Sequence, residues 1–213
     1  MGGLLGRAVV YKFDPIDFNG TTFELDETSV MVMGSTEFLR QNLPIAASYF
    51  PKALTFDAAS ARLPDMFHMS RGYYVFSERA RTVIEHWAPN QVEFIPVACT
   101  AKPKIASVLN FDSAYYFINV LGRAQRLQWR EMEARKFRPQ DDGIERFGLS
   151  QDFHKWKLRE RVLGEPLIWH DAWWRDGNRE YRGHVEVLIE DVLWRELDAN
   201  FPDQLHPLRA GEH

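Results

Sequence analysis

The chain has 213 residues, of which 45% are hydrophobic, 26% charged and 14% aromatic. This composition is typical of a folded globular protein and excludes a disordered one. The net charge of −4 argues against a dedicated nucleic-acid binder, whose affinity comes mainly from neutralising phosphates with Lys and Arg.

The cysteine content and the hydropathy indicate the cellular compartment in which the protein is expected. Cys99 is the single cysteine, so no intrachain disulfide can form and a reducing compartment is expected. Residues 1–10 lack the apolar region of a secretory signal, and nowhere do about 20 apolar residues follow one another. We therefore expect a cytoplasmic protein with no membrane partner. A chain of this length favours one domain over 1–213, with a weak division into a β-rich part, 1–65, and a core, 66–213.

Strands are predicted in the first part of the chain. Residues 8–13 are rich in β-forming side chains, and residues 21–27 alternate apolar with acidic positions. Residues 30–33 form a third apolar run, after which Gly34 and Ser35 favour a brief helix to residue 41.

The clearest predicted unit is a strand, a helix and a second strand. Residues 73–76 form the first strand, and Ser77 stands where a helix N-cap is wanted. Apolar residues then recur at helical spacing to about Trp87. Pro89 ends the helix, and residues 92–97 return as a strand.

The middle of the chain is less regular. Residues 114–129 suit either a strand or a helix, and we favour a strand that opens into irregular structure or a helix. Residues 130–138 are charge-rich, and residues 139–143 form a polar turn.

The last third of the chain returns to short strands and a final helix. Residues 166–169 and 184–189 are predicted strands separated by a polar loop, and residues 190–200 form a helix. Segments 73–97 and 184–208 resemble each other loosely, and align only with gaps. The pattern predicts an α+β fold with a mixed, mainly antiparallel sheet, a few flanking helices and two loosely similar strand-helix-strand units.

Residues that could carry chemistry have simpler structural explanations. Ser77 lacks the flanking glycines of a nucleophile elbow, so helix capping explains it. His170 and Asp171 with His184 are the best metal-binding set, although no HExxH or CxxC pattern supports a zinc site. Cys99 follows an apolar strand and is expected to be buried and inert.

Two further segments are rich in groups suited to binding. A basic stretch could contact phosphate, but interspersed glutamates favour a solvated face with local ion pairs. It contains Arg123, Arg126, Arg130, Arg135, Lys136 and Arg138. Trp173 and Trp174 cannot both point into one core on a strand, so one must be partly exposed. Exposed Trp and Arg are favoured interface anchors, the alternative being that these tryptophans cover the edge of the core.

The order of several segments resembles a family of bacterial immunity proteins of polymorphic toxin systems, immunity family eleven. The matching segments are YYVFSERARTVIEHWAPNQVEFIPV (73–97), YYFINVL (115–121), DGIERF (142–147), PLIWHDAWW (166–174) and HVEVLIEDVLWRELDAN (184–200). The family usually has a serine at the second strand-to-helix junction, where this chain has Ile189 and Glu190.

The resemblance implies a protein that binds and neutralises a cognate secreted toxin without catalysis and without a cofactor. The family supplies no catalytic residues, so partner-binding residues are expected on the Trp-rich and acidic segments: Asp141, Asp142, Glu145, Trp173, Trp174, Arg175 and Asp176. The alternatives are a small intracellular hydrolase or transferase, whose active-site groups would converge only on folding, and an adaptor of a secretion apparatus.

Overall fold

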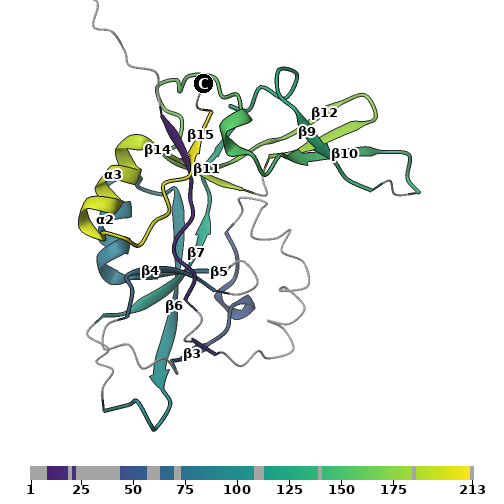
Figure 1. The fold of residues 1–213 in the computed structure, drawn as a ribbon. Helices are drawn as coiled ribbons and strands as arrows, with labels where there is room; N and C mark the ends of the chain where they lie inside the picture. The colour runs from purple at the N-terminus through teal and green to yellow at the C-terminus, as the bar shows by residue number, and fades with distance from the viewer. Residues whose placement is uncertain are drawn as a thin grey trace, which may run out of the picture.

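The structure, a computed structural model, describes residues 9–18, 21–22, 44–56, 63–69, 73–107, 113–138, 141–183 and 186–211. These residues form an α+β fold in which mixed, mostly antiparallel sheets are flanked by helices α2 (Glu78–Trp87) and α3 (Asp191–Asn200), as predicted (Figure 1). The strands are β1 (Val10–Lys12), β2 (Thr21–Thr22), β3 (Ala53–Phe56), β4 (Met66–Met69), β5 (Tyr73–Ser77), β6 (Val92–Ala101), β7 (Tyr115–Val120), β8 (Arg123–Ala124), β9 (Ala134–Lys136), β10 (Glu145–Leu149), β11 (Ile168–Asp171), β12 (Trp173–Asp176), β13 (Arg179–Arg182), β14 (Val187–Glu190) and β15 (Arg209–Ala210). Short 3-10 helices span Ala47–Tyr49 and Phe153–Lys155.

The strands of the described residues group into three sheets. One has the order β15-β1-β14-β11-β8, and a second has the order β2-β3-β6-β7-β5-β4. The third, β12-β13-β10-β9, projects away from the helices (Figure 1). We call this third sheet the arm and the other two sheets with their helices the body.

The predicted strand-helix-strand unit is confirmed as β5, α2 and β6. Ser77 caps α2, because its hydroxyl oxygen accepts the N–H of Ala80 at 3.3 Å. Ala80 and Ile84 lie one turn apart and are buried against the sheets. The helix ends before Pro89, and β6 continues beyond the predicted strand.

The second unit, β14 and α3, is confirmed where the structure describes it. Leu193 and Leu197 are buried as the periodicity predicts. Glu190 occupies the N-cap position without a side-chain cap hydrogen bond. The strand predicted over 184–189 begins at Val187, and His184 lies outside the described residues.

These two units have the same arrangement, and their residues align without a gap. The expectation from the sequence that the two segments align only with gaps is therefore wrong. Ser77 corresponds to Glu190, each ending a strand and starting a ten-residue helix. Asn90 and Asp203 occupy equivalent turns with φ of 62° and 63°. The neighbouring strands correspond as well. β5 lies between β7 and β4, and β14 lies in the same way between β1 and β11.

Each unit also holds a strand of the other through one glutamine. Gln91, after α2, accepts the N–H groups of residues 167–168 at 2.7 and 3.2 Å, where β11 begins. Gln204, after α3, accepts those of residues 65–66 at 2.7 and 2.9 Å, where β4 begins. The two contacts are equivalent and run in opposite directions, as they do between units related by an approximate two-fold axis.

The remaining expectations fall on less regular parts of the chain. The ambiguous segment 114–129 is a strand, β7, that opens into irregular structure, as we favoured. Of the predicted strand 21–27 the structure describes only residues 21–22, which form β2. The apolar run 30–33 and the helix to residue 41 lie outside the described residues.

The main core lies between the two helices and both sheets of the body. Its centre includes Phe13, Phe76, Ile118, Ile189 and Leu193, all 5% exposed or less. No helix within the described part of the chain combines the length and apolar character needed to cross a bilayer.

Candidate functional site

All seven residues predicted to contact a partner lie on the arm. Trp173–Asp176 forms β12, an edge strand of this sheet, and Glu145 begins β10. Asp141 and Asp142 lie in the turn that precedes β10. Folding therefore brings two segments that are distant in sequence onto one sheet (Figure 1).

The arm depends on a tight hairpin between β12 and β13. Gly177 has a φ of +60°, which glycine adopts without steric cost. With Asn178 it forms a two-residue turn that has glycine in the first position, a favoured hairpin connection. Asp176 thereby pairs with Arg179, and β13 goes on to pair in parallel with β10.

The pleat of the sheet divides the five predicted residues that lie on its strands between two faces, since neighbouring side chains along a strand point in opposite directions. Trp173 and Arg175 belong to one face, whereas Trp174, Asp176 and Glu145 belong to the other. We call the first the arginine face. Its residues are Arg135, Phe137, Arg146, Trp173, Arg175, Glu180 and Arg182.

Glu180 organises the arginine face. Its carboxylate is only 2% exposed and accepts hydrogen bonds from Arg182 at 2.7 Å and Arg175 at 2.9 Å. The Nε of Arg146 lies 3.6 Å from the same carboxylate. Burial raises the pKa of Glu180, but the hydrogen bonds from Arg182 and Arg175 outweigh it, so the pKa lies below its ordinary value. One buried anion thus holds two arginines by hydrogen bonds and lies within ion-pair distance of a third.

Trp173 is the exposed aromatic residue of this face. It remains 43% exposed, and the Arg182 guanidinium lies 5.5 Å from its ring centre. This confirms that one of the two adjacent tryptophans is partly exposed. The face carries four arginines and one carboxylate, Glu180, and Asp142 of the adjoining turn pairs with Arg146, so the face is locally positive although the whole chain is acidic.

The opposite face joins the arm to the body. Tyr181 packs against Trp174, Phe147 and Trp129 with ring-centre distances of 4.8, 5.2 and 5.2 Å. Trp129 is buried in the core beneath this sheet. Trp174 is half-buried, and Arg130 lies 5.2 Å from its ring centre. This tryptophan therefore covers the edge of a core, the alternative considered for the pair.

The predicted acidic residues are mostly engaged within the arm. Asp142 pairs with Arg146 through both carboxylate oxygens, and this hydrogen bonding lowers the pKa of Asp142 to about 2. Glu145 lies between Lys136 and Arg179, and hydrogen bonding from Lys136 lowers its pKa. Asp141 is exposed in the turn.

Two neighbouring hollows lie on the surface, and one of them adjoins the arm. The first, of about 420 Å³, lies between Trp174 and residues 125–131. The second, of about 330 Å³, is lined by segment 156–160 and Gly211. Gln128 and Glu131 line both hollows, which are therefore neighbours on the surface.

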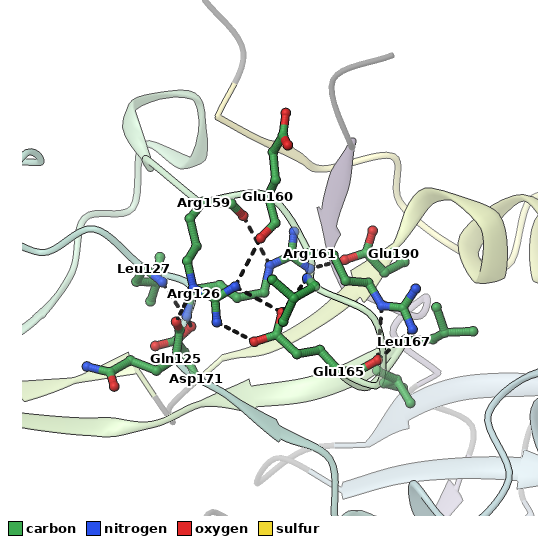
Figure 2. Close-up of polar contacts among 12 residues, drawn as sticks. Gln125, Arg126, Leu127, Arg159, Glu160, Arg161, Glu165, Leu167, Asp171 and Glu190 are labelled. Atoms are coloured by element: carbon green, nitrogen blue, oxygen red, sulfur yellow. Dashed lines mark hydrogen bonds and ion pairs between the residues drawn. The ribbon is translucent and has the colours of Figure 1, made fainter. Parts of the chain in front are cut away.

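A polar cluster surrounds Arg126 and includes Arg159, which also lines the second hollow (Figure 2). Arg126 is only 1% exposed and pairs with Glu190, so the prediction that the whole basic stretch is a solvated face is wrong for this residue. Burial lowers the pKa of Arg126 to about 10, which leaves it charged at neutral pH. Asp171 accepts the backbone N–H groups of Arg126 and Leu127 at 2.7 and 3.0 Å, yet burial raises its pKa to about 6.

Other residues considered for chemistry have structural roles. Ser77 donates its hydroxyl to Asp65 at 2.5 Å besides capping α2. The Nδ1 of His170 lies 3.1 Å from the carbonyl oxygen of Glu186. Among the described residues, which omit His184, no three potential ligands gather as a metal site. Cys99 is half-buried, and burial raises the pKa of its thiol to about 12, so the thiolate is suppressed at neutral pH.

Sequence reasoning did not identify Glu180 or Arg182 as parts of the site. The available signal was the Gly177–Asn178 pair between two segments rich in charged and aromatic residues, which favours a hairpin. The sequence matches no protein-family model and no curated protein.

Proposed function

We propose that this chain is an immunity-type protein that works in the cytoplasm, where it binds and neutralises a cognate bacterial toxin through the arginine face of the arm. The observation that carries the proposal is the exposed Trp173, stacked on an arginine that is itself fixed by buried Glu180. Trp and Arg dominate the energetic centres of protein interfaces. Because their positions are fixed before binding, little conformational entropy is lost on association.

The charge of this face indicates the chemistry of its partner. Arg135 and Arg175 are exposed, and arginines outnumber carboxylates on the face. The matching surface on the toxin is therefore acidic, and mutual attraction accelerates encounter. The net charge alone suggests mild attraction to a basic partner, so the charge of this face indicates the opposite kind of partner. The resemblance to immunity family eleven supports the same class of function.

The test uses the protein encoded by the gene next to that of this chain. Co-expression with this chain should protect host cells, and the two proteins should purify as a complex. Trp173→Ala should weaken binding by at least about 30-fold, which corresponds to about 2 kcal/mol, the level of an interface hot spot. Arg175→Glu should slow association and reduce its dependence on salt.

Val192→Ala is the matched control, because Val192 is similarly exposed, at 42%, but lies on α3. Its binding should equal that of the unmodified chain. Host cells that die despite co-expression, with no complex recovered, would refute the proposal. Turnover of a small substrate by the chain alone, abolished by changes in a hollow, would establish the hydrolase or transferase alternative instead. Recovery of several partners rather than one would indicate an adaptor.

A further inference from the structure

The outer edge of β12 is open to another strand. Within the described residues β12 pairs with β13 on one side, and no strand or isolated bridge lies on its other side. By contrast, the edge strand β4 of the body meets residues 16–18 along its outer side. An open edge presents backbone N–H and C=O groups that can pair with a further strand.

The register of the arm determines which backbone groups of β12 point outward. Glu145 donates its N–H to the carbonyl oxygen of Asn178 at 2.9 Å. Because backbone groups alternate in direction along a strand, those of Glu180 also point toward β10. Arg175 is the partner of Glu180 on β12, so the two form a non-hydrogen-bonded pair. The N–H and C=O of Arg175 therefore point away from β13, to the open edge of the sheet.

The arginine face lies directly beside this open edge. Trp173 and Arg175 both belong to the face and are exposed. Every second side chain of a strand added to β12 would lie on the same face, next to these two residues. Because the face carries four arginines and one carboxylate, acidic side chains at those positions would be attracted and basic ones repelled.

The same charges disfavour a second copy of this chain at the open edge. A symmetric pair of β12 strands would run antiparallel and join the arginine faces of both copies into one, and like charges across a strand pair are destabilising. A nucleic acid would neutralise the arginines, but it cannot continue a ladder of peptide N–H and C=O groups. The occupant that satisfies both the edge and the face is an acidic extended peptide.

We propose that an extended acidic segment of the partner protein adds to the arm as a further strand, pairing with the outward backbone groups of Arg175 and placing acidic side chains on the arginine face. This inference rests on the proposed function and deepens it. In strand addition the backbone hydrogen bonds supply affinity and the alternate side chains supply specificity. The β12–β13 hairpin is formed before binding, so the edge is ready to accept the segment.

Amide-resolved hydrogen exchange of the full chain, with and without the adjacent gene's product, tests this inference on the unmodified protein. In the free chain the Arg175 amide should exchange fast because it points to solvent, whereas the Trp174 amide, which bonds within the β12–β13 ladder, should be protected. In the complex, exchange of the Arg175 amide should slow at least about 100-fold.

The exchange measurement separates the two proposals. A complex in which the Arg175 amide exchanges as fast as in the free chain would overturn strand addition and leave the proposed function standing. If no complex forms, the proposed function itself fails. Protection of this amide that grows with the concentration of the chain alone would identify a second copy as the occupant and overturn the inference. Displacement of the partner by a uridine oligonucleotide would overturn it in favour of a nucleic acid.

Proline at position 175 removes the outward N–H and leaves the β12–β13 ladder intact, because that N–H takes no part in it. Arg175→Ala is the reference, since it removes the same side chain but keeps the N–H. Arg175→Pro should bind the partner at least about tenfold more weakly than Arg175→Ala, because one backbone hydrogen bond is lost and its acceptor is left unsatisfied. Equal binding by the two variants, with the Trp174 amide still protected, would contradict strand addition.

Lys136 supplies the matched control at the opposite edge of the arm. Phe137 donates its N–H to the carbonyl oxygen of Arg146 at 2.8 Å, so by the same alternation the N–H of Lys136 points away from β10. Lys136→Pro and Lys136→Ala should therefore bind the partner equally. A greater loss for proline over alanine at position 136 than at position 175 would place the added strand on β9 and overturn the inference.

Discussion

Changing Gln91 and Gln204 to leucine tests the reciprocal exchange between the two units. Each change deprives two backbone N–H groups of their acceptor, at residues 167–168 for Gln91 and 65–66 for Gln204. An unsatisfied buried donor costs about 1–3 kcal/mol, and both sites are part-buried, so each variant should lose about 2–4 kcal/mol of unfolding free energy. The two losses should agree within about 1 kcal/mol because the sites are equivalent.

Urea denaturation measures these losses, and hydrogen exchange locates them. In the Gln91 variant the amides of residues 167–168 should exchange faster while those of 65–66 stay protected, and the Gln204 variant should show the reverse. Glutamate at either position keeps an acceptor and is the matched control, with a smaller loss expected. A loss below about 0.5 kcal/mol in either leucine variant, or accelerated exchange in the wrong unit, would refute the exchange as a stabilising feature.

Two further predictions concern the buried polar cluster. Because the pKa of Asp171 is raised to about 6 in the folded chain from an ordinary 3.8, the stability it contributes is complete below about pH 4 and is lost as the pH rises through 6. The free energy of unfolding of Asp171→Asn should therefore rise by up to about 3 kcal/mol, relative to that of the unmodified chain, between pH 4 and pH 7. Urea denaturation at both pH values measures this difference, and a difference that stays constant would contradict the prediction. Glu190→Gln should lower the free energy of unfolding by about 3–5 kcal/mol, because it removes the carboxylate that pairs directly with buried Arg126. Adding Arg126→Met should restore most of the loss, and failure of this second change to rescue stability would show that the pair is not the cause.

The parts of the fold that were predictable are those specified by local sequence. The unit from β5 to β6 has a serine cap, an apolar stripe and a proline stop within one short segment, and each signal agrees with the others. β12 and β13 carry tryptophan, tyrosine and charge on both faces, so the period of two that identifies a half-buried strand is hidden.

Long-range relationships were the hardest to predict. Burial of Arg126 depends on Glu190, which is far away in sequence, so a charge-rich stretch gives no hint of it. The repeat had a signal in two short recurring patterns. One is Pro-X-X-aromatic-His at 64–68 and 166–170, and the other is Pro-X-Gln at 89–91 and 202–204. Neither is long enough to establish a repeat until the strand register aligns them.

The candidate site was predictable in its residue types and not in its geometry. Adjacent tryptophans imply that one is exposed, and Trp173 is. Which face holds Trp173 depends on the register of β12 against β13, which is set by the turn at Gly177. The role of Glu180 depends on the same register, since it places three arginines around one carboxylate.

The repeat also explains why the proposed contacts lie where they do. Segments present in both units, such as the helices and the glutamine turns, serve the shared scaffold. The first unit joins β4 to β5 through residues 70–72, whereas the second joins β11 to β14 through a connection that contains the β12–β13 hairpin. Segment 159–165 likewise lies in the connection that leads to β11, outside the corresponding strands. The hairpin still packs on the body through Tyr181 and Trp174, whereas Trp173 on its other face is 43% exposed, and that exposed side chain is the one on which the proposed function depends.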